Sequence, residues 1–312
     1  MDGVNAITKY AFVFSGQGSE RVGMFTNLSK ESGELEQMIN QLKEQIGLDV
    51  SDIINSNDRD VIAANNQILL YIFHQLMSKL IVGKVGFHPT VCMGHSFGQF
   101  SAIANSGAVS FSDMAAFIRE RHRIVNSPEI EVRALFKSIH GMTLDTFYSF
   151  QEKEGLKGSV ELAIHNQKEQ IVVAATKIGE EKLKELSAKY NFILKEIHVS
   201  RPYHTSFMYK YNRLLLPYIN ELNFSNPQFP ILMNHSKQLI DDKTLLLEET
   251  KIQMVNPVFW YDSIEIVSNM VDAFVIVDPS ETQLKIIKRV SNKKIYNVNN
   301  MGVLKMIDKR GL

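Results

Sequence analysis

A serine flanked by two glycines is the strongest sign of chemistry in this sequence. Ser96 lies in the segment 94–98 (GHSFG), between an apolar, β-favouring run and a helix-favouring segment. A Gly-x-Ser-x-Gly turn between strand and helix holds the serine hydroxyl at a sharp, exposed bend, and the following helix directs unpaired N–H groups to the same point. We therefore expect Ser96 to be a nucleophile and the N–H of Phe97 to bind an oxyanion. Because the pattern fixes only three positions, a chance match in an ordinary turn stays open.

A serine hydroxyl at neutral pH needs a neighbouring base, and histidine is the usual one. The sequence contains nine histidines. His95 adjoins Ser96, but neighbouring side chains on a bent turn diverge, so we expect His95 to support the site rather than act as the base. Most of the other histidines stand in no recognisable motif, and an ordinary hydrogen-bonded or solvated position explains each of them.

A second candidate group is an arginine on the apolar face of a predicted helix. Residues 113–126 have helical apolar periodicity, with Ser112 as the expected N-cap. At about 100° per residue, Arg121 falls in the middle of the apolar face, whereas Arg119 and Arg123 point away. A guanidinium that faces inward needs an anion, and a carboxylate fits its planar fork best. From the pattern by itself, an internal Asp or Glu partner, or a side chain that extends to the surface, is the better explanation of such an arginine.

The elements that must position these residues are those of an α/β protein. Strand, turn and helix follow one another around Ser96, with the helix expected at residues 99–105, which predicts a largely parallel sheet. Short apolar runs rich in β-favouring residues predict its strands. These runs are residues 10–14, 90–93, 230–233 and 273–277.

A different order of elements follows in the middle of the chain. It reads strand, helix, strand, strand, helix, strand, which is the ferredoxin-like pattern. The predicted elements are residues 134–140, 143–153, 159–164, 170–175, 178–190 and 192–199. We therefore expect a catalytic domain formed by residues 1–130 and 200–312, with residues 131–199 as an inserted small subdomain and a ligand crevice between the two.

Composition excludes several classes of protein. Lys and Arg (34) balance Asp and Glu (34), so no overall field attracts nucleic acid or an anionic membrane. No apolar run is expected to cross a bilayer, the N-terminus lacks a secretory pattern, and Cys92 is the only cysteine. No cluster of metal-ligand residues stands out. We expect a cytoplasmic protein with no metal and no nucleic-acid or membrane partner.

Four motifs in order resemble those of malonyl-CoA:acyl carrier protein transacylases and of the acyltransferases of polyketide synthases. They are FVFSGQGS (12–19), GHSFG (94–98), Tyr203-His204 and NPVFW (256–260). The resemblance covers the chain from Tyr10 to about residue 290. It implies an α/β-hydrolase-like core with a ferredoxin-like insert.

The resemblance also assigns site roles. It implies that His204 is the base, that the backbone carbonyl of Gln253 orients its imidazole, and that the backbone N–H of Gln17 is the second oxyanion donor. It implies that Arg121 binds the free carboxylate of malonyl. Tyr203 stands where malonyl-selective relatives carry phenylalanine, which favours malonyl over methylmalonyl.

Three further residues resemble substrate-pocket positions: Gln67, Asn166 and His95. Gln67 and Asn166 could equally be ordinary polar residues of a helix and a strand end. A basic run close to the C-terminus offers a docking patch for an acidic carrier protein, although such runs are more often solvated helix faces. It comprises Lys285, Lys288, Arg289, Lys293 and Lys294.

The implied function is an acyltransferase that moves malonyl from coenzyme A to the phosphopantetheine thiol of an acyl carrier protein through an ester on Ser96. Coenzyme A thioester is then a substrate, and no cofactor is bound permanently. Ser15, Glu20 and Gln99 depart from the usual motifs, where proline, glutamine and glutamate are common. These departures favour a discrete enzyme that serves a polyketide synthase in trans over a general fatty-acid enzyme. Two alternatives are an acyl hydrolase of the same fold that clears stalled acyl groups from carrier proteins, and a docking protein without chemistry.

Overall fold

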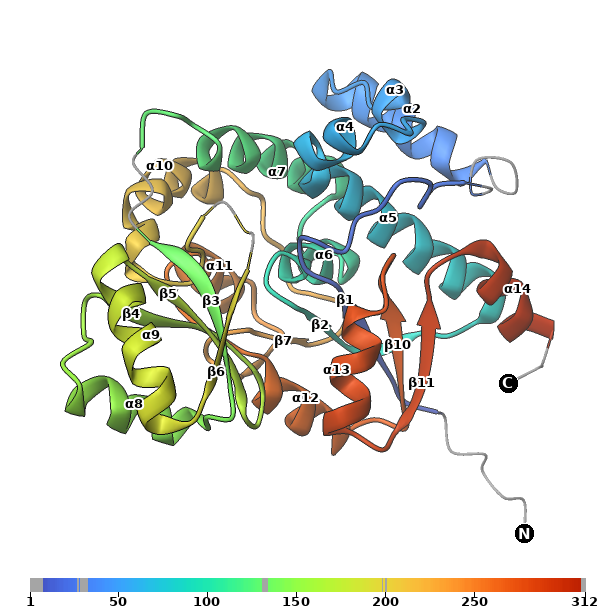
Figure 1. Cartoon of the computed structure of the whole chain (residues 1–312). Helices are drawn as coiled ribbons and strands as arrows, with labels where there is room; N and C mark the ends of the chain where they lie inside the picture. The colour runs from blue at the N-terminus through green and yellow to red at the C-terminus, as the bar shows by residue number, and fades with distance from the viewer. Residues whose placement is uncertain are drawn as a thin grey trace, which may run out of the picture.

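Two β-sheets organise the chain (Figure 1). The computed structural model describes residues 8–26, 28, 33–130, 134–197, 199 and 201–309. The large sheet has the strand order β11-β10-β1-β2-β7-β8, and its neighbouring strands are parallel except for β8, which pairs antiparallel with β7. Its strands are β1 (Tyr10–Phe14), β2 (Pro89–Gly94), β7 (Ile231–Leu232), β8 (Leu239–Ile240), β10 (Ala273–Val277) and β11 (Lys294–Val298). The predicted largely parallel sheet is confirmed.

Near-continuous apolar sequence produces the central strands of this sheet. All five residues of β10 are buried, as are four of the five in β1, because helices cover both faces of a parallel sheet. Helix α6 packs on β1 and β2, and α5 and α7 pack on α6. The helices of this part are α2 (Glu34–Ile46), α3 (Ser51–Ile54), α4 (Arg59–Ala64), α5 (Asn66–Leu80), α6 (Gly98–Asn105), α7 (Phe111–Val125), α10 (Tyr209–Asn220), α11 (Lys243–Ile252), α12 (Trp260–Ser268), α13 (Thr282–Val290) and α14 (Met301–Lys309), with short helical turns η1 (Ile81–Val85) and η2 (Ser206–Met208).

Helix α5 corrects one expectation from the sequence. With η1 it forms a stretch, Asn66–Val85, that is long and apolar enough by length and composition to cross a membrane, although no such segment was expected. Most of this stretch is buried inside the protein, where α5 packs against α6 and α7. Its buried polar side chains, including Gln67 and His74, form hydrogen bonds with neighbouring elements. The apolar composition is therefore that of a core helix.

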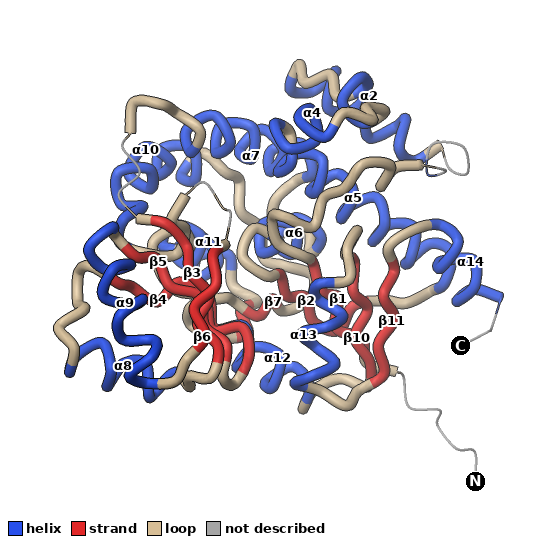
Figure 2. The backbone as a smooth tube through the Cα atoms, in the orientation of Figure 1, coloured by secondary structure: helices blue, strands red, loops and turns tan. Residues whose placement is uncertain are grey.

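The small sheet has the strand order β6-β3-β5-β4-β9. Strands β3 and β4 flank β5, which is antiparallel to both, so the predicted ferredoxin-like pattern is present. Figure 2 shows the two sheets side by side, with α8 and α9 against the small one. Its elements are β3 (Leu135–His140), α8 (Leu144–Lys153), β4 (Val160–Gln167), β5 (Gln170–Ala175), α9 (Lys177–Tyr190), β6 (Ile193–Glu196) and β9 (Val258–Phe259).

The predicted division into domains remains an interpretation. Residues 1, 131, 200 and 312, at four of its limits, lie outside the described residues. In favour of the division, the small sheet has an apolar cluster of its own, which includes Phe147, Phe150 and Leu183. Strand β9 comes from the part of the chain assigned to the catalytic domain and pairs in parallel with β4. The last predicted strand, residues 192–199, is shorter than expected and ends at Glu196.

The N-terminus of α7 differs from the expectation. The N-cap is Ser110, whose extended backbone lets its side chain accept a hydrogen bond from the N–H of Asp113 at 3.1 Å. Ser112, the predicted cap, lies inside the first turn. Its hydroxyl is directed away from the helix end and bonds to the side chains of Gln41 and Gln45. Periodicity placed the helix correctly, but two serines compete for the cap, and tertiary contacts decided between them.

Candidate active site

Ser96 lies on the tight turn that the sequence predicted. Strand β2 ends at Gly94, α6 begins at Gly98, and Ser96 between them has a φ of 53°, in the left-handed region that most side chains avoid. A Cβ on Gly94 would lie 2.0 Å from the backbone carbon of Gly98, and a Cβ on Gly98 would lie 2.3 Å from the carbonyl oxygen of Phe14. Only glycine fits these two positions, so the glycines hold the serine at the bend.

Hydrogen bonds fix the backbone of Ser96 on both sides. Its N–H donates to Oδ1 of Asn234 at 2.9 Å, and its carbonyl accepts from Nε2 of Gln253 at 3.0 Å. Nδ2 of Asn234 also donates to the carbonyl of Gly94 at 2.7 Å. Asn234 was not predicted from the sequence, because no motif marks it. The available signal was its place just after a strand of the parallel sheet, since the carboxyl ends of such strands meet at one edge.

His204 lies against the nucleophile. Its Nε2 is 2.6 Å from Oγ of Ser96, and its Nδ1 is 3.0 Å from the carbonyl oxygen of Gln253. Because a carbonyl only accepts, Nδ1 carries the proton and Nε2 is left to accept from the serine hydroxyl. Burial lowers the pKa of His204 to about 3, with the Gln253 carbonyl opposing the shift. The imidazole is therefore neutral at pH 7, as a general base must be.

Two backbone N–H groups, one in the Ser96 turn and one in the loop packed on it, have no acceptor among the described residues. At the start of α6 the N–H groups of Gly98 and Gln99 bond to carbonyls of the turn at 2.9 and 3.1 Å, but the N–H of Phe97 has no acceptor among the described residues. The N–H of Gln17 likewise has no acceptor within the described chain. Its loop packs on the turn, since a Cβ on Gly16 would lie 2.8 Å from Nδ1 of His95. Unpaired donors at this position can bind a developing oxyanion.

Arg121 faces inward, as its helical position predicted. It is 2% exposed, and its Nη1 donates to Oε1 of Gln67 at 2.7 Å. The guanidinium carbon lies 5.8, 5.4 and 5.0 Å from the ring centres of Phe97, Phe100 and Tyr203. Burial lowers the pKa of Arg121, and Tyr203 partly opposes this shift. Phe97 belongs to the turn that carries Ser96, so the guanidinium lies beside this turn.

The guanidinium of Arg121 is incompletely paired. Its Nε has no hydrogen-bond partner, and no carboxylate among the described residues lies within 4.0 Å of it. The two alternatives that the sequence left open, an internal acidic partner and an exposed guanidinium, are therefore wrong for the described chain. A buried cation without a counter-ion is costly, so the site is suited to an anionic ligand.

The remaining predicted residues surround the same turn. Nε2 of His95 lies 3.0 Å from Oδ1 of Asn166, which is on β4 of the small sheet, so this contact joins the two sheets. Burial lowers the pKa of His95 to about 4. Nε2 of Gln67 donates to Oε1 of Gln17 at 3.5 Å, and Tyr203 is buried. All ten residues singled out from the sequence thus lie in one connected region.

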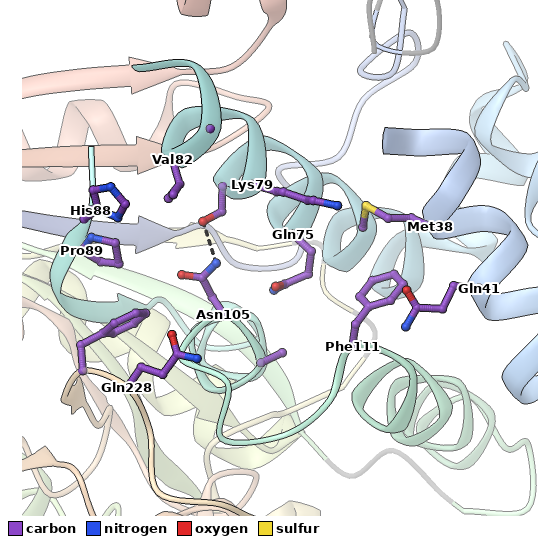
Figure 3. A pocket seen from close by; sticks show the side chains of 14 residues that line it. Met38, Gln41, Gln75, Lys79, Val82, His88, Pro89, Asn105, Phe111 and Gln228 are labelled. Atoms are coloured by element: carbon purple, nitrogen blue, oxygen red, sulfur yellow. Dashed lines mark hydrogen bonds between the residues drawn. The ribbon is translucent and has the colours of Figure 1, made fainter. Parts of the chain in front are cut away.

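A cavity of 560 Å³ lies elsewhere (Figure 3). It is lined by Asn105 at the end of α6 and by Pro89 at the start of β2, whereas Ser96 lies between the opposite ends of these elements. None of the residues predicted for the site lines this cavity. It is therefore separate from the catalytic turn.

Sequence comparison shows which known proteins this chain resembles. Residues 11–306 match the family described as acyl transferase domain. The malonyl CoA-acyl carrier protein transacylase of Bacillus subtilis (strain 168) is 26% identical over 294 residues, which cover 92% of each chain. The enzyme of the same name from Staphylococcus aureus (strain MRSA252) is 25% identical and covers 91% of this chain and 93% of its own.

Solved structures show the same fold. The malonyl CoA-acyl carrier protein transacylase of Coxiella burnetii superposes with a TM-score of 0.89 at 21% identity, over 97% of this chain and 98% of that one. A malonyl-transacylase solved in complex with its type II polyketide synthase acyl-carrier protein gives a TM-score of 0.88 at 21% identity, over 97% and 100% of the two chains. The family match over nearly the whole sequence, together with the serine turn and its histidine, shows that this chain is an acyltransferase and belongs to the acyl transferase domain family.

Proposed function

We propose that the protein transfers malonyl from coenzyme A to the phosphopantetheine thiol of an acyl carrier protein. The observation that carries this proposal is the buried Arg121 guanidinium, which has no carboxylate partner among the described residues and lies 5.8 Å from the ring centre of Phe97 in the nucleophile turn. An enzyme for neutral acyl groups would gain nothing from a buried cation that it must desolvate. A substrate with a free carboxylate pairs with that cation and places its thioester at Ser96.

In the proposed cycle Ser96 attacks the thioester carbonyl and its proton passes to Nε2 of His204. The N–H groups of Gln17 and Phe97 bind the oxyanion, and the Gln253 carbonyl stabilises the imidazolium through Nδ1. The C–S bond then breaks, and the coenzyme A thiolate takes the proton from His204. The carrier thiol repeats these steps in reverse, which restores the serine hydroxyl. The cycle uses no permanently bound cofactor.

Tyr203 gives a basis for acyl selectivity. It precedes His204, is buried, and its ring centre lies 5.0 Å from the Arg121 guanidinium carbon and 6.3 Å from the His204 ring centre, so it lies close to both cation and base. A bulky ring there disfavours a methyl branch on the acyl group. Exclusion of one carbon contributes about 1–3 kcal/mol. We therefore propose a moderate preference for malonyl over methylmalonyl.

For the partner, we propose a carrier protein of a polyketide synthase served in trans. A malonyl-transacylase of this fold was solved with a type II polyketide synthase acyl-carrier protein, and Ser15, Glu20 and Gln99 depart from the usual motifs. A cytoplasmic location is in keeping with the single, buried Cys92.

The predicted docking patch on and after α13 lies at the border of the small sheet. Its Arg289 donates to Oε1 of Gln167 at the end of β4. Reversal of the exposed Lys288 and Lys294 to glutamate is expected to lower the rate of transfer to a carrier protein a few-fold at low salt and to weaken its salt dependence. Loading from malonyl-CoA serves as the internal control. An unchanged rate and salt dependence of transfer would show that this patch does not bind the carrier protein.

The decisive experiment follows the fate of the acyl group by intact-protein mass spectrometry. After incubation with malonyl-CoA, we expect a malonyl adduct that is lost on Ser96→Ala and that persists until a holo carrier protein is added, when the mass moves to the carrier. Rapid release of free malonate without a carrier would favour the acyl hydrolase instead. Absence of an adduct with malonyl-CoA, acetyl-CoA and acetyl-carrier protein would favour a docking protein without chemistry.

A further inference from the structure

A buried histidine lies beneath the loop that carries Gln17. His74, on α5, is fully buried, and its Nε2 lies 3.1 Å from Oγ of Ser15. Its Nδ1 lies 2.9 Å from Oγ of Ser101, a buried residue of α6. Ser15 stands two residues before Gln17, and α6 follows directly from the turn of Ser96. One imidazole therefore joins the start of the loop to the helix of the nucleophile.

The side chains of Ser15, His74 and Ser101 can pair one another's hydrogen-bond donors and acceptors. A neutral imidazole offers one donor and one acceptor nitrogen, and each hydroxyl can supply the complementary group. Burial lowers the pKa of His74 to about 3, so the ring stays neutral at working pH. Buried polar groups are costly unless each is hydrogen-bonded. The hydrogen bonds among Ser15, His74 and Ser101 therefore favour this one arrangement of loop and helix.

Few other hydrogen bonds hold the loop in place. Among the described residues, the N–H of Ser15 reaches the carbonyl of Val277 at 3.4 Å and the side chain of Gln17 reaches Gln67 at 3.5 Å, both near the limit for a hydrogen bond. The N–H of Gly18 bonds locally to Glu20. Within the described chain, the 3.1 Å contact to His74 is therefore the closest polar link from this loop to the rest of the protein.

We propose that Ser15, His74 and Ser101 form a positioning clamp that fixes the N–H of Gln17 relative to Ser96. The inference rests on the proposed oxyanion role of Gln17. An oxyanion donor stabilises the transition state and not the bound substrate. Loosening the clamp is therefore expected to lower kcat in both half-reactions and to leave KM unchanged.

The test uses Ser15→Ala, His74→Phe and the double variant. Loss of a whole oxyanion donor costs about 100- to 1,000-fold in kcat, so a displaced donor is expected to cost about 10-fold. Because both single changes break the same link, the double variant is expected to lose no more than His74→Phe alone. In His74→Gln the side-chain amide reaches about as far from the backbone as Nε2 of histidine and can bond to Ser15. This variant is therefore expected to recover part of the kcat that His74→Phe loses.

Ser106→Ala is the matched control. Ser106 is a buried serine at the end of α6 whose hydroxyl donates to the carbonyl of Ile103 at 2.7 Å, away from the site. Its loss is expected to lower Tm without a change in kcat. The clamp is refuted if folded Ser15→Ala keeps kcat within two-fold of wild type, or if Ser106→Ala lowers kcat equally. Should His74→Phe fail to fold, the comparison of Ser15→Ala with Ser106→Ala decides.

These outcomes are separable from failure of the proposed function. Each variant is compared with wild type on whichever acyl donor loads Ser96, so the clamp is judged from a ratio of rates. A wild-type protein that forms no adduct with any donor would overturn the proposed function, and the clamp with it. A loaded wild type with unaffected variants would overturn the clamp alone.

Discussion

The two ends of the candidate site differ in how their functional side chains are paired within the protein. At the reacting end, Ser96 and His204 are bonded to each other, and Gln253 bonds to both. At the other end Nη1 of Arg121 donates to Gln67, the guanidinium lies against the Tyr203 ring, and its Nε has no partner among the described residues. The bonds among Ser96, His204 and Gln253 fix the reacting atoms in the resting protein, whereas the incompletely paired guanidinium keeps a donor with which a ligand can pair. The chain therefore holds the proposed Ser96–His204 dyad in place by itself, and we expect the substrate carboxylate to complete the cation site.

The largest effect is expected at the reacting end. Ser96→Ala removes the nucleophile, so we expect no covalent adduct and a fall in transfer rate of about 10,000-fold or more. Binding of malonyl-CoA at the cation end should persist, because Arg121 and Gln67 are untouched. Mass spectrometry and calorimetric titration measure the two separately. Loss of binding together with the adduct would mean that the two ends are not independent.

A smaller effect is expected at the incomplete end. Gln67→Leu removes the 2.7 Å hydrogen bond that Nη1 of Arg121 donates to Oε1 of Gln67. Hydrogen bonds to charged groups contribute about 1.5–3 kcal/mol, so we expect malonyl loading to fall about 10-fold through a misplaced guanidinium. Acetyl loading should be unchanged, since an acetyl group has no carboxylate to bind. Equal losses for both donors in stopped-flow loading would contradict this division of roles.

The smallest effect on the rate is expected from pH. Burial lowers the pKa of His204 to about 3, so its base form persists and the loading rate of folded protein should be nearly flat from about pH 8 to pH 5. Stability behaves differently. His74, His95 and His204 have pKa values of about 3, 4 and 3, below the ordinary 6.5, so between these values the unfolded chain binds more protons.

The free energy of unfolding is therefore expected to fall as pH drops below about 6.5. Urea denaturation from pH 7 to pH 4 measures this slope, and single-turnover loading at the same pH values measures the rate. A rate that falls with an apparent pKa near 6.5, at constant stability, would show that the base is not buried as described.

Local signals in the sequence predicted much of the fold and the site. Strand runs such as residues 10–14, the Gly-x-Ser-x-Gly turn and the face of Arg121 depend on period and spacing, which a sequence carries directly. His204 and Gln253 came only through a family resemblance, because no local pattern marks a base more than 100 residues from its nucleophile. Asn234 and His74 were missed since their partners are distant in sequence. The cap of α7 was misplaced because the choice between Ser110 and Ser112 depends on contacts with α2.

The most direct test of the account is a competition between malonyl-CoA and acetyl-CoA for loading of Ser96, read by intact mass. Wild type is expected to carry mainly malonyl, and Arg121→Ala is expected to shift the malonyl-to-acetyl ratio at least about 100-fold toward acetyl, because the guanidinium no longer pairs with the carboxylate. Arg123→Ala, on the exposed side of the same helix, is the matched control and should keep the wild-type ratio. An unchanged ratio in Arg121→Ala would contradict the central claim that this buried cation selects a substrate with a free carboxylate.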